Sequence, residues 1–220
     1  MMRKLTLITA AVSTLLSSCS KEEGKDYLPK IDALKKVVQN FSKDSKQDGE
    51  EYFLEPPIGA RWEYSLENMV PFLGVQKGKV LRRVDGEETI NGKTYFKTVT
   101  VFSGIPGRES YHYYWRKGPD GLYEIDGTDL PEYLDTPLPL TVGMNWTVQY
   151  PNEQQKCSAE AIETVELFDR KYENCLKISF AGEGYSGYSY YAPDVGLVKR
   201  VIKRNREGSV EEWVLDKYKL

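Results

Sequence analysis

The stretch YSYYAPDVGLVKRV, residues 188–201, decides how this chain is expected to fold. Paired aromatic residues lead into Pro193-Asp194, and Gly196 then opens an apolar run. Proline presets the backbone of a turn and aspartate bonds to nearby backbone groups there. The pattern therefore predicts a strand, a tight turn and a returning strand, and it favours a fold-forming segment over an active-site signature.

A second stretch of the same kind, YYWRKGPDGLYEI, occupies residues 113–125. Gly59-x-x-Trp62 precedes this stretch, and Gly143-x-x-Trp146 precedes the one at 188–201. The same order of elements indicates an internal repeat. Each half would be an antiparallel meander that cannot bury its apolar face alone, so the two halves are expected to close on each other.

The predicted fold class is mainly β. Two antiparallel meanders are expected to form a β-barrel or a strongly curved half-barrel or sandwich, with one N-terminal amphipathic helix. The 16 tyrosines and the frequent Gly and Pro turns fit this class. The β-domain is expected over 56–220, with meander halves at about 56–130 and 137–220, and Asn91-Gly92 predicts a two-residue hairpin turn within it.

The first 18 residues resemble the signal peptide of a bacterial lipoprotein. Arg3 and Lys4 precede an uncharged apolar run, Leu5–Leu16, that is too short to span a membrane as a helix. The sequence LSSC that follows resembles a lipobox, a branched apolar residue and two small residues before a cysteine. Cys19 is therefore predicted to become the mature N-terminus and to carry acyl chains, palmitate among them.

Residues 19–55 are expected to form a lipid-anchored tether. Within it, apolar residues recur at helical spacing and predict a helix at about 29–41. Several acyl chains hold a protein stably on a membrane, and the membrane is the first expected partner. Ser20 and Lys21 lack the aspartate that resembles an inner-membrane retention signal. The predicted location is thus the outer membrane, facing the periplasm or the cell surface.

A family resemblance covers about residues 137–202. The phrases PLTVGMNW, YENCLKI and YYAPDVGLVK resemble uncharacterised bacterial envelope lipoproteins that end in a similar Ala-Pro-x-x-Gly-Leu-Val-Lys phrase. These are loosely similar to curved-sheet, half-barrel lipid-handling lipoproteins. The resemblance implies a barrel or half-barrel with an apolar groove and carries over no catalytic residues. The chain departs from the pattern at Phe168–Lys171, where many such sequences have a Gly-Thr-Phe turn.

The residue inventory argues against several kinds of chemistry. His112 is the single histidine, so a histidine-based triad or metal site would depend on it alone. Strand alternation places it opposite Tyr111, Tyr113 and Trp115, on the sheet surface. No catalytic, metal or cofactor site is predicted. After loss of the leader, 28 basic residues face 33 acidic ones, so nucleic acid is not expected as a partner.

Two further features leave alternatives open. Cys157 and Cys175 would lie in an oxidising envelope, which favours a disulfide. A hairpin centred on Arg170–Lys171, however, would put them nine residues apart along one strand, too far for a bond. The basic run at 199–206 is interpreted as the cross-strand partner of acidic residues at 211–216.

The preferred function is a non-enzymatic binding module for an apolar or extended ligand, or for an envelope protein. The concavity of the sheet would be the site, because aromatic side chains offer large apolar area with a polar handle. Two alternatives remain, a hydrolase using carboxylates in the same groove and a structural or adhesive surface protein. The residues predicted to contact the ligand are Trp62, Tyr114, Trp146, Tyr190 and Tyr191.

Overall fold

The computed structural model describes residues 49–53 and 55–220. A short 3-10 helix, η1 (Glu50–Tyr52), precedes twelve strands that form one antiparallel sheet. The strands are β1 (Arg61–Val70), β2 (Gly74–Ile90), β3 (Lys93–Ser103), β4 (Tyr111–Gly118), β5 (Gly121–Ile125), β6 (Tyr133–Pro137), β7 (Asn145–Gln149), β8 (Gln154–Leu167), β9 (Arg170–Gly182), β10 (Tyr185–Ala192), β11 (Gly196–Arg204) and β12 (Ser209–Lys219).

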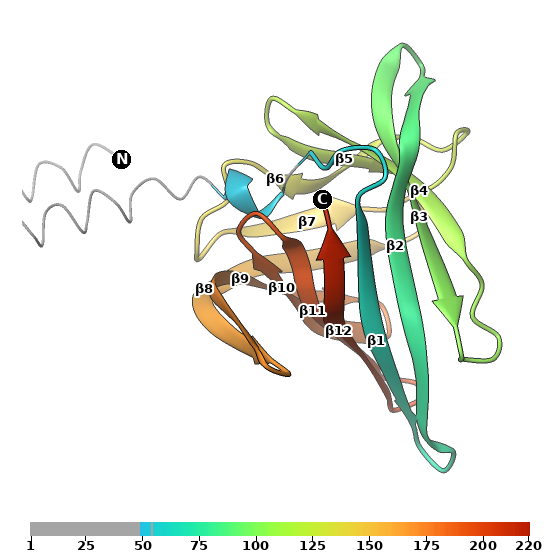
Figure 1. Cartoon of the computed structure of the whole chain (residues 1–220). Coiled ribbons are helices and arrows are strands. Elements are labelled where there is room, and N and C mark those ends of the chain that lie inside the picture. Colours follow the sequence, from blue (N-terminus) through green and yellow to red (C-terminus); the bar gives the residue numbers. More distant parts are fainter. Residues whose placement is uncertain (1–48, 54) are drawn as a thin grey trace, which may run out of the picture. The chain divides into compact units, whose positions relative to one another are not determined.

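The sheet consists of two up-and-down meanders joined side by side. Its order is β6-β5-β4-β3-β2-β1-β12-β11-β10-β9-β8-β7, so β1 to β6 form one meander and β7 to β12 the other. The first strand pairs with the last, from Arg61 opposite Lys219 to Met69 opposite Val210. The strands curl round a common interior into a nearly closed barrel (Figure 1). The predicted pair of meanders is confirmed, with six strands in each half.

Side chains close the seam between β6 and β7, the two ends of the sheet order. The indole Nε1 of Trp146 on β7 donates a hydrogen bond of 2.8 Å to the carbonyl oxygen of Asp135 on β6. Beside it, the rings of Tyr133 and Tyr150 meet edge to face with centroids 4.9 Å apart. These contacts hold the two edges together where a backbone ladder would otherwise do so.

The internal repeat predicted from Gly-x-x-Trp is present in the backbone. Gly59 and Gly143 have φ angles of 90° and 89°, a left-handed region that favours glycine. Each donates its N–H to a strand later in its own half, Gly59 to the Val84 carbonyl and Gly143 to the Ala159 carbonyl. The two halves therefore begin with the same turn, which places a tryptophan three residues later facing the interior.

Three of the turns are those that the sequence predicts. Asn91 and Gly92 join β2 to β3 with φ angles of 51° and 77°, the conformation of a type I′ hairpin turn. Pro119-Asp120 joins β4 to β5 as a two-residue turn. In the matching place of the second half, Ala192 pairs with Gly196 across Pro193-Asp194-Val195. Both Pro-Asp stretches therefore close hairpins.

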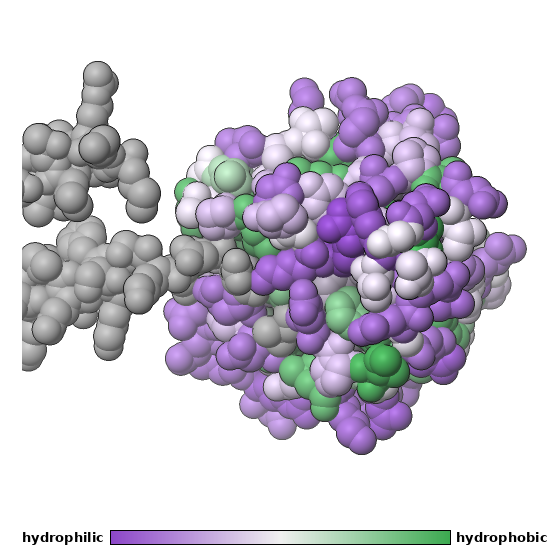
Figure 2. Space-filling view, turned by 90° about the horizontal axis from the view of Figure 1, so that it is seen from above, coloured by the Kyte–Doolittle hydropathy of each residue, from purple (hydrophilic) through white to green (hydrophobic). Residues whose placement is uncertain are grey.

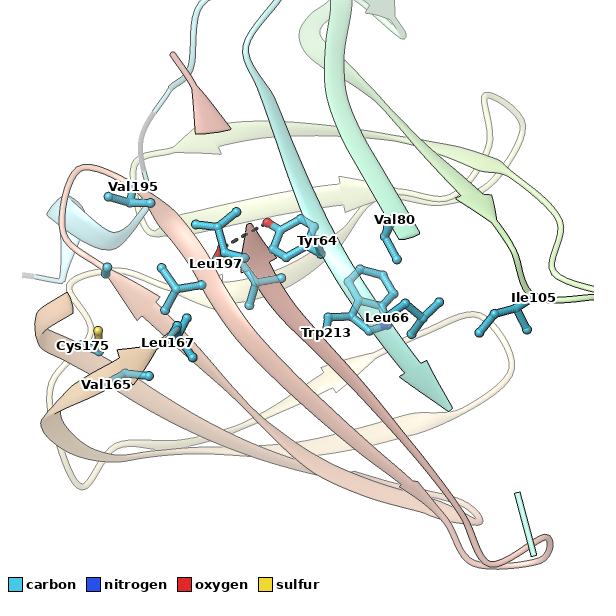
Figure 3. Packing of buried hydrophobic residues seen from close by; sticks show 13 residues of the cluster. Tyr64, Leu66, Val80, Ile105, Val165, Leu167, Cys175, Val195, Leu197 and Trp213 are labelled. Atoms are coloured by element: carbon cyan, nitrogen blue, oxygen red, sulfur yellow. Dashed lines mark hydrogen bonds between the residues drawn. The ribbon is translucent and has the colours of Figure 1, made fainter. Parts of the chain in front are cut away.

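The hydrophobic core fills one part of the interior and joins the two halves (Figure 3). Tyr64 on β1 is buried there, and its hydroxyl donates a 3.0 Å hydrogen bond to the Leu197 carbonyl on β11. Trp213 on β12 packs against the Tyr64 ring, with centroids 5.9 Å apart. The buried members of this cluster are Tyr64, Leu66, Val80, Ile105, Val165, Leu167, Cys175, Ala192, Val195, Leu197, Val198, Trp213 and Leu215.

The two interior cysteines are free thiols, and both are buried. Cys157 pairs with Phe180 and Cys175 pairs with Glu163 across the β8–β9 hairpin, which separates them by six residues along β8. The hairpin turns at Phe168-Asp169, because Leu167 pairs with Arg170. The predicted turn centre at Arg170–Lys171 is therefore wrong by two residues. The geometric argument against the disulfide holds in this register.

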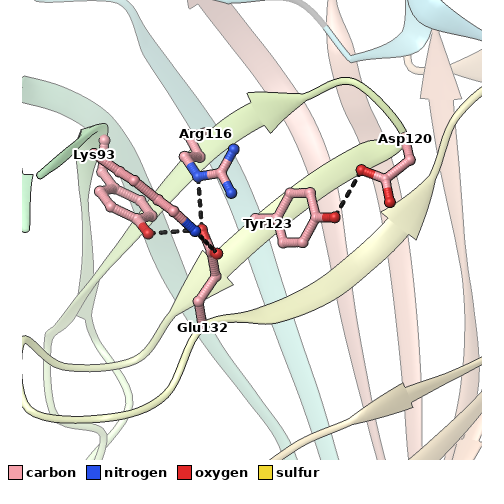
Figure 4. A network of polar contacts seen from close by, with 6 residues as sticks. Lys93, Arg116, Asp120, Tyr123 and Glu132 are labelled. Carbon is pink, nitrogen blue, oxygen red and sulfur yellow. Dashed lines mark hydrogen bonds and ion pairs between the residues drawn. The ribbon is translucent and has the colours of Figure 1, made fainter. Parts of the chain in front are cut away.

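A polar network covers the outer face of β3, β4 and β5 (Figure 4). Glu132 is its centre. The Tyr95 hydroxyl and Arg116 Nε each donate to Glu132 Oε1 at 2.6 Å, and Lys93 Nζ lies 2.6 Å from Oε2. The guanidinium of Arg116 also stacks over the Tyr123 ring at 4.4 Å. The network fixes the loop before β6 to the meander.

We expect Glu132→Gln to lower the free energy of unfolding by about 2 kcal/mol, because it removes the charge from three hydrogen bonds. Burial alone would raise the pKa of Glu132, but the bonds from Arg116, Lys93 and Tyr95 outweigh it and lower the pKa to about 2. The ionised carboxylate therefore stabilises the fold above its ordinary pKa of 4.5. This contribution is lost as the pH falls from about 4.5 towards 2.

Urea unfolding of both proteins at several pH values tests this prediction. The difference between wild type and Glu132→Gln should be full at neutral pH and should shrink below about pH 4. Glu173→Gln is the matched control, because its ion pair with Lys171 is exposed and should contribute less than about 1 kcal/mol. A constant difference down to about pH 2 would contradict the role assigned to the charge.

The predictions for the N-terminal part fall outside the described residues. These are the signal peptide, Cys19 and its acyl chains, and the helix at about 29–41. Within residues 49–53 and 55–220, no helix is long and apolar enough to cross a membrane.

Candidate functional site

The interior of the barrel contains a cavity of about 320 Å³ that is lined from both meanders. Its most distinctive feature is its aromatic wall, because all four tryptophans of the chain line it. They come from β1, β4, β7 and β12, so the wall draws on strands far apart in the sequence. These four are Trp62, Trp115, Trp146 and Trp213.

The structure brings together three of the five residues predicted to contact a ligand. Trp62, Trp146 and Tyr191 line the cavity. Tyr114 instead lies in a small cluster on the outer face of the sheet, with Ile90, Tyr95 and Ile125. It follows strand alternation, since its neighbours Tyr113 and Trp115 point inward.

Tyr190 also lies outside the cavity, and its hydroxyl donates a 2.9 Å hydrogen bond to Glu163 on the outer face. Adjacent residues of a strand face opposite sides of a sheet, so Tyr190 points outward where Tyr191 points inward. The pairing of β10 with β11 also shifts between these two residues. His112 is exposed, as predicted, while Tyr111, Tyr113 and Trp115 line the interior.

The segment around η1 covers one part of the cavity. Tyr52 is buried and its hydroxyl donates a 2.9 Å hydrogen bond to the Asn174 carbonyl. The Phe53 ring lies against Tyr191 with centroids 5.1 Å apart. The backbone carbonyl of Glu51 accepts a 3.0 Å hydrogen bond from the N–H of Asp194. The last part of the predicted tether thus packs against the Pro-Asp turn.

Charged side chains share this interior, which the sequence-based prediction of an apolar groove missed. Arg82, Glu124, Asp135 and Arg200 all line the cavity. Arg82 Nη2 donates a hydrogen bond to the Tyr113 hydroxyl, and its guanidinium lies 5.6 Å from the centre of that ring. The cavity is therefore amphipathic.

The position of Arg200 contradicts the interpretation of the whole basic run at 199–206 as cross-strand partners of acidic residues. Lys199 pairs with Glu212 at 2.6 Å across β11 and β12, as that interpretation expects. Arg200 instead lies over the Phe180 ring at 5.0 Å, inside the barrel. Its Nε is buried and has no hydrogen-bond partner among the described residues.

The two acids lie on neighbouring strands. Glu124 of β5 pairs with Tyr133 of β6, and Asp135 follows two residues later on the same strand. Burial, and next the charge of Asp135, raise the pKa of Glu124 well above its usual value. Burial also raises the pKa of Asp135, against a 2.9 Å hydrogen bond from the Thr136 hydroxyl and the charge of Arg200. Both carboxyls are therefore harder to ionise than carboxyls in water.

The outer surface offers a plain contrast to this interior. On the face that Figure 2 shows, hydrophilic residues predominate and hydrophobic residues form small separate areas. Within residues 49–53 and 55–220, no three His, Cys, Asp or Glu side chains gather in a way that could hold a metal ion. The cavity thus combines aromatic walls with buried charges.

Three solved structures are similar to this chain. A "putative exported protein with YmcC-like fold" from Bacteroides fragilis aligns with a TM-score of 0.49 and 13% identity over 76% of this chain and 99% of that one. A "putative lipoprotein" from Parabacteroides distasonis gives a TM-score of 0.40 and 16% identity over 76% and 98%. A LolA superfamily protein from Nitrosomonas europaea gives 0.29 and 10% over 80% and 92%.

No protein-family model and no curated protein matches the sequence.

Proposed function

We propose that this chain is a non-enzymatic binding protein whose ligand occupies the interior of the barrel. The single observation that carries this proposal is the interior cavity of about 320 Å³ with all four tryptophans in its wall. Barrel interiors of small proteins are usually filled by side chains, and a remaining cavity with aromatic walls and a few polar groups is typical of a ligand site.

The size of the cavity narrows the ligand class. A volume of about 320 Å³ is the share of about ten water molecules in the liquid, near the lower end of small-molecule sites. The ligand is therefore a compact molecule or one end of a longer one. An extended polymer or a whole protein segment would not fit inside.

The predicted N-terminus supplies the setting for this function. Cys19 with its acyl chains would anchor the protein to the outer membrane, and residues 19–48 would connect the anchor to the domain. The barrel would then work at the membrane surface, facing the periplasm or the exterior, where small amphiphiles are released from and taken up into lipid.

Intrinsic tryptophan fluorescence tests the proposal, because every tryptophan reports on the cavity. Titration of the full chain with 1-decanol and with decanoate should change the emission saturably for at least one of them. Ser189→Phe should lower the affinity for the bound probe at least about tenfold. Ser189 is 3% exposed and lines the cavity, so a phenyl ring there fills the space that the ligand needs.

Ser186→Phe is the matched control for this variant. Ser186 lies on the same strand but lines a groove on the other side, with Lys156 and Tyr188. It should leave the affinity of both probes unchanged. Saturable binding that survives Ser189→Phe unchanged, in a protein with wild-type unfolding, would place the probe elsewhere and contradict the proposal.

The second candidate is a carboxylate-dependent hydrolase, which one observation favours. Glu124 and Asp135 face the same cavity, and both have raised pKa values, as the acid of an acid–base pair does. Mass spectrometry of ligand recovered after incubation with the protein separates the two functions. Unchanged ligand supports binding, whereas conversion that disappears in Glu124→Gln supports hydrolysis.

A further inference from the structure

The arginines inside the barrel point to the chemistry of the ligand, because one of them has a buried N–H without an acceptor among the described residues. Arginine stays protonated in proteins, so Arg82 and Arg200 bring two fixed positive charges into the cavity. Three acids share the cavity with them: Glu124 of β5, Asp135 of β6, and the exposed Asp126, which directly follows β5. A buried donor of a charged group without an acceptor is costly, which makes a missing acceptor informative.

The two arginines differ in how well they are satisfied. Arg82 donates to the Tyr113 hydroxyl and stacks on that ring, so its position is fixed. Arg200 contacts the face of Phe180, and its buried Nε lacks an acceptor among the described residues. A guanidinium with a free Nε edge can donate to two oxygens of one carboxylate at once.

The acids do not supply the missing acceptor. Burial raises the pKa of Glu124 and of Asp135, and the charge of Asp135 adds to the shift of Glu124, so both carboxyls are harder to ionise than in water. Neither acid accepts from the Arg200 Nε, which keeps a buried donor without an acceptor among the described residues. A bound carboxylate would supply that acceptor, and the acids that share the cavity disfavour a second negative charge on the ligand.

We propose, building on the proposed function, that the ligand is a compact amphiphilic monoanion whose carboxylate binds Arg200 while its apolar body lies against the tryptophans. The Nε edge of Arg200 and the ring of Phe180 are the recognition elements. Arg82 contributes charge from the opposite half of the barrel. The aromatic wall accepts an alkyl or aromatic body without selecting strongly between them.

Head-group variation at constant chain length tests this proposal on the wild-type chain. We expect decanoate to bind at least about tenfold more tightly than 1-decanol at neutral pH, measured by tryptophan fluorescence. Decyl phosphate, which carries more than one negative charge at this pH, should bind more weakly than decanoate. Tighter binding of decyl phosphate would overturn the assignment in favour of a phosphate site.

Substitution of Arg200 tests whether this residue is the one that binds the carboxylate. Arg200→Met should lower the affinity for decanoate at least about tenfold and leave that for 1-decanol unchanged or raised. Arg200→Lys, which keeps the charge without the planar donor edge, should fall between the two. Arg206→Met is the matched control, since Arg206 is 87% exposed and pairs at 3.9 Å with an equally exposed Glu183.

The outcomes separate the two proposals. Equal affinity of the wild type for decanoate and 1-decanol would overturn the anion site while leaving cavity binding intact. Absence of binding for every probe would overturn the proposed function itself. Because the head-group comparison uses the wild type, it stays decisive even where Arg200→Met fails to fold.

Discussion

Replacement of Glu211 by alanine is expected to lower the free energy of unfolding by about 3–5 kcal/mol. Glu211 is 2% exposed, which is unusual for a carboxylate. Its Oε1 accepts a 2.7 Å hydrogen bond from the indole Nε1 of Trp213, and its Oε2 pairs with Arg108. Arg204 lies 3.8 Å from the same oxygen. Alanine would remove the counter-charge of two guanidinium groups and leave the Trp213 N–H without its acceptor.

The size of this loss comes from the buried groups that Glu211→Ala would leave without a partner, and not from the energy of the ion pair itself. Two exposed charges gain little from each other, but a half-buried Arg108 cannot regain its water without local opening. Arg108 also lies over the Phe102 ring at 5.7 Å, so the loop between β3 and β4 is held to β12 through Glu211. Loss of the carboxylate should therefore loosen the contact between the two meanders.

Urea unfolding with two companion variants tests this account. Glu211→Gln keeps an acceptor for Trp213 but removes the charge, so we expect about half of the alanine effect. Glu212→Gln changes the next residue, whose pair with Lys199 is partly exposed, and should cost less than about 1 kcal/mol. Equal stability of Glu211→Ala and Glu212→Gln would contradict the structural role of Glu211.

The sequence predicted the topology well because turn chemistry is local. Asn91-Gly92 and the two Pro-Asp turns specify hairpins through their own backbone preferences, whatever the rest of the chain does. Gly59 and Gly143 adopt matching left-handed conformations for the same reason.

The site was predicted only in part because its charged half depends on tertiary context. Alternation in VLRRV places Arg82 on the same face as the buried Val80 and Val84, a signal that could have revealed one inward arginine. Arg200 follows a register shift in the β10–β11 hairpin, so simple alternation does not determine which way it points. Tyr190 was misplaced at the same irregularity.

Gly187→Ala is expected to lower the free energy of unfolding by about 3 kcal/mol, at the upper end of overpacking effects. Gly187 lies on β10 between Phe180 of β9 and Ile202 of β11. A Cβ atom there would lie 2.0 Å from the Val201 carbonyl oxygen and 2.7 Å from Phe180 Cζ. The carbonyl belongs to the backbone, so relief of the clash must move β10 and β11 apart.

The matched control is Gly86→Ala on β2, where a Cβ atom would meet nothing within 4 Å. Alanine there should change the free energy of unfolding by less than about 1 kcal/mol. The change should be stabilising if the substitution acts only by lowering the conformational entropy of the unfolded chain. Phe180 also carries Arg200 on its face, so Gly187→Ala should weaken decanoate binding as well as stability. Equal stability of the Gly187→Ala and Gly86→Ala proteins would contradict this prediction. It would mean that β10 and β11 leave room for a Cβ atom at residue 187 beside the Val201 carbonyl.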